Sequence, residues 1–134
     1  MTSTRKQIVL VEDNPLNCDV IEDIFEFDEI DAELITVGSG EEALELARAL
    51  HPALMLMDIR LPGIDGLEVT KQLKSDAETQ DIEIWAITAH AMKGDAQKAM
   101  EAGCSQHITK PINSTDLALK LRNFVGQETC EVME

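Results

Sequence analysis

The sequence predicts an α/β domain in which five helices cover a doubly wound parallel sheet of five strands. Two observations lead to this prediction. Short apolar runs alternate with segments of helical periodicity along the chain, which is the pattern of repeated strand–helix units. The three central runs are almost wholly apolar, as expected for parallel strands buried on both faces of the sheet. The length of 134 residues suits one domain with its own core.

Apolar runs predict the strands, and capping residues predict the helices. The predicted strands are Ile8–Val11, Leu34–Val37, Leu54–Met57, Ile84–Ile87 and Gln106–Thr109. The predicted helix starts are Asn14-Pro15, Ser39 with Glu42, Asp65 with Glu68, Met92, and Asn113 or Ser114. In the first helix, Leu16, Val20, Ile24 and Phe27 follow at helical spacing, the pattern of a buried face. Gly103 predicts the end of the fourth helix at Ala102.

The charge balance excludes some classes of partner. The chain has 11 basic and 26 acidic side chains and a net charge of −15. Nucleic acids and anionic membrane surfaces are bound mainly through Lys and Arg, so neither is an expected partner. The three cysteines, Cys18, Cys104 and Cys130, form no metal-binding or disulfide pattern and are expected to be reduced. The first apolar run is too short for a signal peptide, so a cytoplasmic location is expected.

Polar residues follow four of the predicted strands. They are Glu12-Asp13, Asp58, Thr88 and Lys110-Pro111. Each feature alone is ordinary, since an acidic pair, a threonine or a lysine after a strand usually belongs to a solvated loop or a turn. The carboxyl ends of parallel strands open on one edge of the sheet, however, and ligands bind there. We therefore expect these side chains to converge.

Three carboxylates and one lysine indicate a particular chemistry. Two like charges about 4 Å apart repel by about 4 kcal/mol at an effective dielectric of 20, so the carboxylates need a cation. A few hard oxygen ligands with room for water favour Mg²⁺. A divalent ion and a lysine beside Asp58 suit phosphoryl transfer, which depends on positioning and charge neutralisation. The hydroxyl of Thr88 offers one more donor to a phosphoryl oxygen.

Four stretches of the chain resemble receiver domains of two-component response regulators. They are IVLVEDNPLN, LMLMDIRLPGIDGLEV, IWAITAHAMKGD and AGCSQHITKPI, and together they span most of the chain from about Lys6 to Val125. The stretches LPGIDGLEVTKQLK and AHAMKGD are most similar to DivK-like single-domain regulators and to receivers of hybrid kinases. The resemblance implies a flavodoxin-like receiver fold with strand order 2-1-3-4-5. The end of the chain carries no core pattern, so we expect residues 1–126 to form the domain and residues 127–134 a C-terminal tail.

The resemblance also implies a role for each site residue. Asp58 accepts the phosphoryl group, and Asp13 and Asp58 bind Mg²⁺ directly together with the backbone carbonyl of Arg60. Glu12 acts on the ion mainly through water. Lys110 bridges to the phosphoryl group, and a cis bond to Pro111 is implied.

Thr88 is the implied switch hydroxyl, and the backbone N–H of Ala89 donates to the phosphate. Two features depart from the commonest family pattern. His107 occupies a position that usually holds Tyr or Phe and swings inward on activation, so it is either a switch residue or an ordinary strand residue. The rim positions hold Arg60 and His90, which are bulky and polar.

The expected function is that of a single-domain response regulator. It takes a phosphoryl group from a histidine kinase or histidine phosphotransfer protein onto Asp58, and it catalyses only its own phosphotransfer and dephosphorylation. A downstream protein target is expected to bind through about Met92–Val125. The chain could equally be a phosphorelay intermediate or a piece of a hybrid kinase.

Other functions fit the residues less well. A hydrolase that uses an aspartyl phosphate needs a second Asp two residues after Asp58, where this chain has Arg60. A receiver-like interaction module that is never phosphorylated stays open, although such modules usually lose part of the acidic pair, the Asp or the Lys. No glycine-rich phosphate-binding motif follows a strand, which argues against nucleotide binding.

Overall fold

The computed structural model describes residues 6–61, 63–88 and 94–126. Strands and helices alternate along this part of the chain. In order they are β1 (Lys6–Val11), α1 (Pro15–Phe27), β2 (Ala32–Val37), α2 (Gly40–Leu50), β3 (Leu54–Asp58), α3 (Gly66–Ser75), β4 (Glu83–Thr88), α4 (Asp95–Ala102), β5 (Gln106–Thr109) and α5 (Ser114–Val125). Every predicted strand is present, and four of the five extend by one or two residues beyond the predicted run.

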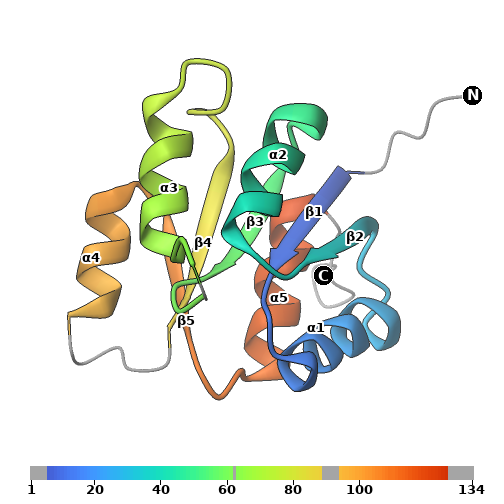
Figure 1. Ribbon diagram of the computed structural model, residues 1–134. Coiled ribbons are helices and arrows are strands. Elements are labelled where there is room, and N and C mark those ends of the chain that lie inside the picture. The colour runs from blue at the N-terminus through green and yellow to red at the C-terminus, as the bar shows by residue number, and fades with distance from the viewer. Residues whose placement is uncertain (1–5, 62, 89–93, 127–134) are drawn as a thin grey trace, which may run out of the picture.

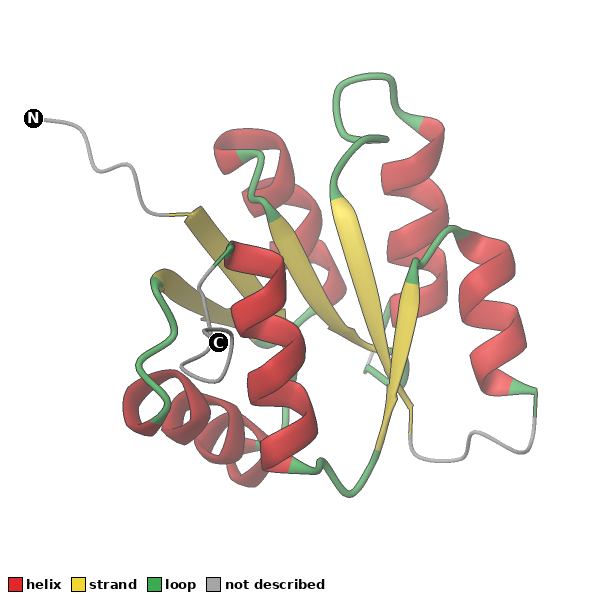
Figure 2. Cartoon of the chain, turned by 180° about the vertical axis from the view of Figure 1, so that it is seen from behind, coloured by secondary structure: helices red, strands yellow, loops and turns green. Residues whose placement is uncertain are grey.

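The five strands form one parallel sheet in the order β2-β1-β3-β4-β5. Helices α2, α3 and α4 cover one face of this sheet, and α1 and α5 cover the other (Figures 1 and 2). The predicted doubly wound fold and the strand order implied by the resemblance are therefore confirmed. The proposed tail, residues 127–134, lies outside the described residues, so the domain boundary at residue 126 stays a prediction.

Two apolar clusters form the core, one on each face of the sheet. Alternate residues of β1 divide between them: Val9 and Val11 join the cluster under α2, α3 and α4, and Ile8 and Leu10 join the cluster under α1 and α5. All five residues of β3 are buried, which explains its continuous apolar run. On the α5 side, the buried ring of Trp85 lies edge-on to the ring of Phe124, with 5.7 Å between centroids.

Side-chain caps begin the helices largely where the sequence predicts. The side-chain oxygens of Asn14, Ser39, Asp65 and Asn113 each accept a hydrogen bond from a backbone N–H of the first turn, at 2.9 to 3.2 Å. The carboxylate of Glu42 does not complete the predicted capping box, because it accepts from the N–H of Gly38 instead of Ser39.

The start of α4 differs from the prediction. Met92 lies outside the described residues, and within them α4 begins at Asp95. Gly94 precedes the helix with a φ of 84°, a left-handed conformation that cannot continue a right-handed helix. The helix ends at Ala102 before Gly103, as predicted.

The predicted apolar face of α1 is wrong in part. Leu16 and Phe27 are 72% and 75% exposed, and Val20 is 36% exposed. The residues of α1 that are fully buried are Ile21 and Ile24. A helix of 3.6 residues per turn places these two isoleucines on one stripe and the three exposed side chains on a neighbouring stripe, and the sheet covers only the first.

Among the described residues, no helix combines the length and the apolar character that crossing a membrane requires.

Candidate phosphoryl-acceptor site

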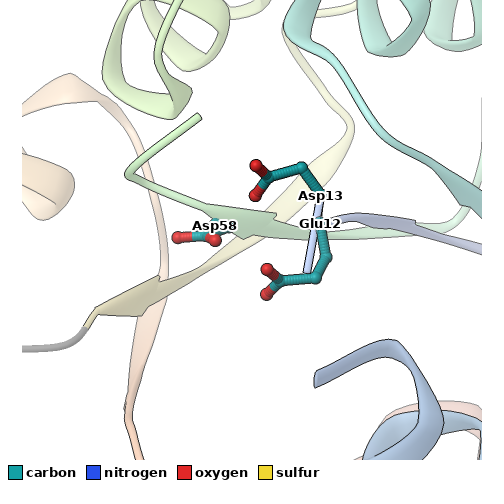
Figure 3. A group of neighbouring side chains, drawn as sticks. All are labelled: Glu12, Asp13 and Asp58. Atoms are coloured by element: carbon teal, nitrogen blue, oxygen red, sulfur yellow. The ribbon is translucent and has the colours of Figure 1, made fainter. Parts of the chain in front are cut away.

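The predicted site residues converge at the carboxyl ends of four strands. Glu12 and Asp13 follow β1, Asp58 ends β3, Thr88 ends β4 and Lys110 follows β5. One carboxylate oxygen of each acidic residue lies within 4.8 Å of the others. Figure 3 shows the three carboxylates at the same end of neighbouring strands, with Asp58 beside the Glu12-Asp13 pair. The convergence expected from the parallel sheet is confirmed for these side chains.

Asp58 is held in one orientation by two donors. It is 3% exposed, at the end of a wholly buried strand. Its Oδ1 accepts a hydrogen bond of 3.0 Å from the backbone N–H of Arg60, and its Oδ2 accepts one of 3.2 Å from the Nζ of Lys110. The two carboxylate oxygens therefore differ, because one faces the following loop and the other faces a cation.

A glycine allows α3 to begin close to Asp58. A Cβ on Gly66, the first residue of the helix, would collide with the backbone carbonyl oxygen of Asp58 and lie 2.9 Å from the Cα of Ile59. The backbone N–H of Gly66 donates to the carbonyl of Ile59 at 2.9 Å. This close approach fixes the loop after Asp58 against the start of α3. Sequence analysis missed this role of Gly66, for which the only local signal is a glycine directly after the capping residue Asp65.

Lys110 is shared between two carboxylates. Its Nζ lies 3.2 Å from Asp58 Oδ2 and 3.4 Å from Glu12 Oε1. Burial acts to lower the pKa of Lys110, but the charge and hydrogen bond of Asp58, followed by those of Glu12, outweigh it and raise the pKa. The ammonium group is therefore charged at neutral pH. The Lys110–Pro111 peptide bond is cis, as the resemblance implies.

Glu12 is the most buried acid of the group. Its side chain is fully buried, its Oε2 accepts a hydrogen bond of 3.1 Å from the backbone N–H of Asn14, and its Oε1 has no hydrogen-bond partner of good geometry among the described residues. Burial raises the pKa of Glu12, as do the charge and hydrogen bond of Asp58, while Asn14 and Lys110 oppose the rise. Asn14 thus both caps α1 and orients Glu12, a second role that the capping pattern does not reveal.

The acidic group fits a hard divalent cation. Its donors are carboxylate oxygens, two of them on buried residues and one on the exposed Asp13. Oε1 of Glu12 has no hydrogen-bond partner among the described residues, and the cation that the structure places beside it is Lys110, at 3.4 Å, which Glu12 shares with Asp58. Asp13 and Arg60 also line a cavity of about 540 Å³ beside the group, so solvent can reach this side of it. The residues present therefore match the Mg²⁺ preference inferred from the sequence.

The remaining predicted residues differ in what the structure shows of them. Thr88 is fully buried, and its Oγ1 has no hydrogen-bond partner among the described residues. His107 is exposed on β5, away from the buried acids. Ala89 and His90 lie outside the described residues, so the predicted backbone contact and the rim position are not seen.

Comparison with known proteins gives the family. The family model for the response regulator receiver domain matches residues 8–122 of the sequence, so the chain belongs to this family. The polar-differentiation response regulator DivK of Brucella ovis is 45% identical over 121 residues, covering 90% of this chain and 97% of DivK. DivK of Brucella anthropi is 43% identical over the same shares of the two chains.

Solved structures of receivers superpose closely. The receiver domain of the sensor histidine kinase PA1611 from Pseudomonas aeruginosa, which has a magnesium ion coordinated in its active-site cleft, is 31% identical with a TM-score of 0.81, over 92% of this chain and all of that one. The phosphorylated cyanobacterial phytochrome response regulator RcpA is 29% identical with a TM-score of 0.75, over 90% and 91% of the two chains.

The chain is therefore a receiver-domain response regulator of the DivK type, a signalling protein of two-component systems. Phosphorylation and Mg²⁺ are typical of this family, whose members act with histidine kinases or phosphotransfer proteins and with downstream targets. The family assignment leaves no support for the aspartyl-phosphate hydrolase considered above.

Proposed function

We propose that Asp58 accepts a phosphoryl group from the phosphohistidine of a histidine kinase or histidine phosphotransfer protein. The observation that carries this proposal is the position of Asp58. It is a buried carboxylate whose Oδ2 lies 3.2 Å from Lys110, beside two further acids that suit a divalent cation. Glu12 is also a buried carboxylate beside Lys110, but the contact is longer, at 3.4 Å, and its side chain is fully buried, so a phosphoryl donor can reach it less easily.

In the proposed step, an Asp58 carboxylate oxygen attacks phosphorus, and the new P–O bond forms as the P–N bond to the donor imidazole breaks. The bonding electrons return to the imidazole nitrogen, and because the donor ring carries a proton on its other nitrogen, it leaves as neutral imidazole without a protein acid. Lys110 neutralises charge on the phosphoryl oxygens, and the hydroxyl of Thr88, which has no partner among the described residues, donates to one of them. The N–H of Ala89, outside the described residues, is the further donor that the family pattern suggests.

Mg²⁺ is the proposed cofactor. Asp13, Asp58 and the carbonyl of Arg60 would hold it directly. Glu12 would act through water, because its Oε2 already accepts a hydrogen bond from Asn14 and its Oε1 lies beside Lys110. When bound, the ion supplies positive charge that offsets the phosphoryl oxygens. Water later hydrolyses the acyl phosphate and regenerates Asp58, so the chain catalyses only its own phosphorylation and dephosphorylation.

The proposed output is protein contact in the cytoplasm. The target surface would lie within residues 92–125, which include α4, β5 and α5, although 92 and 93 lie outside the described residues. Thr88 would act as the switch hydroxyl, and His107, exposed on β5, would change its contacts in response. A stand-alone regulator, a relay intermediate and a piece of a hybrid kinase all fit this proposal.

Phosphorylation with acetyl phosphate and Mg²⁺ tests the assignment. The wild-type chain should gain one phosphoryl group that is labile to base, as an acyl phosphate is, and both Asp58→Asn and a chelator should abolish the gain. Asp81→Asn is the matched control, because Asp81 is exposed before β4, at the opposite end of the sheet. Label that persists in Asp58→Asn would overturn the assignment, and a wild type that no donor labels would favour the unphosphorylated interaction module.

A further inference from the structure

β2 forms an edge of the sheet that is open to another strand. It pairs with β1 alone, and the parallel register is regular over six residues, from Lys6 opposite Ala32 to Val11 opposite Val37. In Figure 1, β2 lies at the end of the sheet between α2 and α1. No strand of the described residues pairs with its outer side, so part of its backbone is available for hydrogen bonding.

The two edges of the sheet are protected to different degrees. Edge strands in natural proteins are usually short, or carry proline, lysine or a bulge that prevents pairing with another chain. β5 is four residues long and is followed at once by Lys110-Pro111. β2 is six residues long, has no proline, lysine or bulge, and has Glu33 as its one charged residue. β2 is therefore the edge better suited to strand addition.

A hollow beside this edge can receive side chains of an added strand. It has a volume of about 360 Å³ and is lined by Val37, Glu42, Glu45, Leu46 and Ala49. Val37 and Leu46 are half-buried against the core cluster under α2, so the floor of the hollow is apolar. A side chain reaching in from a neighbouring strand would bury this apolar surface.

The charges around the hollow identify the class of occupant. Glu42 and Glu45 line it, and no Lys, Arg or His is among its lining residues. Glu33 lies on the same face of β2 as Ile35 and Val37, which pack toward α2. Two glutamates thus line the hollow itself, and Glu33 lies further along the same face of the open strand.

A second copy of this chain is a poor occupant. Antiparallel pairing of two β2 strands about a twofold axis would place the α2 helices of both copies on the same face of the joined sheet. Full antiparallel pairing would set Val37 of each copy opposite Ala32 of the other, so Glu33 of one copy would lie near the glutamate-lined hollow of the other. Each chain also carries a net charge of −15. A basic partner would instead be attracted by these glutamates and by the negative charge of the chain.

We propose that the outer edge of β2, together with the hollow beside α2, binds an extended basic segment of a partner protein by strand addition. Backbone hydrogen bonds to β2 would supply affinity. Side chains alternate between the two faces of a strand, so every second residue of the segment would face the hollow. An apolar residue there would cover Val37 and Leu46, and Lys or Arg residues two positions away on either side would meet the glutamates. This surface lies at the β2 edge of the sheet, opposite the edge formed by β5, so its partner need not compete with a target bound on β5.

Titration of the ¹⁵N-labelled full chain with the synthetic peptide acetyl-KTVTKT-amide tests the proposal. Its first, third and fifth residues share one face and present a valine between two lysines. We expect saturable amide shift changes confined to β2 and α2, together with slower hydrogen exchange of β2 amides. The charge-reversed peptide acetyl-ETVTET-amide should produce neither change. A version methylated on the amide nitrogens of two adjacent residues should also fail, because one of them faces β2 in either register.

Two protein variants distinguish binding at the hollow from nonspecific attraction between a basic peptide and an acidic protein. Glu45→Lys should weaken binding by about threefold or more. Glu101→Lys should leave it unchanged, because it makes the same charge change on exposed α4, at the other side of the molecule. The proposal would be overturned by an equal loss of binding in both variants or by full binding of the methylated peptide. Amide shift changes centred on α1 or on the acidic site would also overturn it. A dimer of the chain alone with protected β2 amides would assign the edge to a second copy instead, and would equally overturn it.

Discussion

At the scale of single residues, the site depends on how two buried carboxylates share one lysine. Lys110 lies between Glu12 and Asp58, and only Asp13 of the three acids is exposed. Without a divalent ion this arrangement leaves more negative than positive charge in a partly buried space.

Asp13→Asn should stabilise the protein when no divalent ion is present. Removing one negative charge relieves repulsion with its neighbours, and because Asp13 is exposed we expect a rise in melting temperature of only roughly 3–5 °C. In the wild type, Mg²⁺ at one hundred times its Kd should stabilise the native state by about 2.7 kcal/mol, and the variant should lose most of that response. Thermal melts with chelator and with millimolar Mg²⁺ measure both effects. Asp81→Asn is the control for the metal response: it removes a contact with His51 and can shift the melting temperature, but it should keep the wild-type response to Mg²⁺. A wild type insensitive to Mg²⁺ would contradict the prediction.

Glu12 should make the metal-free protein less stable as the pH rises. Burial and Asp58 raise its pKa above the ordinary 4.5, so in this range the native state binds more protons than the unfolded state. The free energy of unfolding therefore falls as the pH increases upward from 4.5 through the raised pKa. Urea unfolding in chelator between about pH 5 and 8 measures this slope, which Glu12→Gln should flatten. Identical slopes in the two proteins would remove Glu12 as the cause.

At the scale of secondary-structure elements, the first residues of the helices position the loops that carry the site residues. Four helices begin at residues whose side chains cap them. Two of these caps belong to loops of the site: Asn14 directly follows Asp13, and Asp65 ends the loop that begins after Asp58. The start of α3 is the tightest of these contacts, because Gly66 lies against the backbone of Asp58. The position of Asp58 thus depends on how closely a helix can approach a strand.

Gly66→Ala should therefore impair both stability and phosphorylation. The added methyl group would meet the carbonyl oxygen of Asp58 and the Cα of Ile59, both backbone atoms, which cannot rotate away. We expect a loss of about 1–3 kcal/mol in the free energy of unfolding, and slower labelling of the folded variant by acetyl phosphate. Gly38→Ala is the matched control, because a Cβ there meets nothing within 4 Å. Urea unfolding and phosphorylation rates measure the two effects, and equal behaviour of the two variants would contradict this role for Gly66.

Much of the fold could be predicted at this scale because its signals are local. Apolar runs mark strands and capping residues mark helix starts without reference to the rest of the chain. The face of α1 could not be assigned so simply, because Leu16, Val20 and Phe27 form a stripe as regular as that of Ile21 and Ile24. Which stripe is covered depends on how the helix packs on the sheet.

The same distinction explains what the sequence revealed of the site. The acidic pair, Asp58 and Lys110 could be predicted because each follows a strand of a parallel sheet. The second contact of Lys110 with Glu12, the hydrogen bond from Asn14 and the close approach of Gly66 could not. These contacts depend on distances of a few ångströms between segments that only the folded chain brings together.

At the scale of the whole molecule, the sheet separates the acidic site from the surfaces that can report its state. The site lies at the carboxyl ends of the strands, while β5 is an edge strand on which His107 is exposed. A change at Asp58 can reach a partner bound there through Thr88 at the end of β4 and through Lys110 directly after β5. Whether His107 takes part in that transmission is an open prediction.

If His107 is a switch residue, it should make partner binding depend on pH. The inward position buries the ring, and burial disfavours the charged imidazolium. The affinity of the phosphorylated protein for its target should then weaken as the pH falls from about 8 to 6, and His107→Tyr should remove that dependence. Titrations of both phosphorylated proteins with the target measure the effect. Equal pH profiles would leave His107 as an ordinary residue of the strand surface.

The packing of Trp85 against Phe124 gives the molecule an intrinsic optical probe. The chain has one tryptophan and no tyrosine, so emission excited near 295 nm comes from a single buried indole, whose N–H is hydrogen-bonded to Glu83 at 2.9 Å. Its ring contacts α5 directly, while its strand, β4, ends at Thr88. Any displacement of α5 that follows a change at Thr88 would alter the quenching and polarity around this fluorophore. Stopped-flow fluorescence of the unmodified protein can therefore follow signalling in real time, without an attached dye.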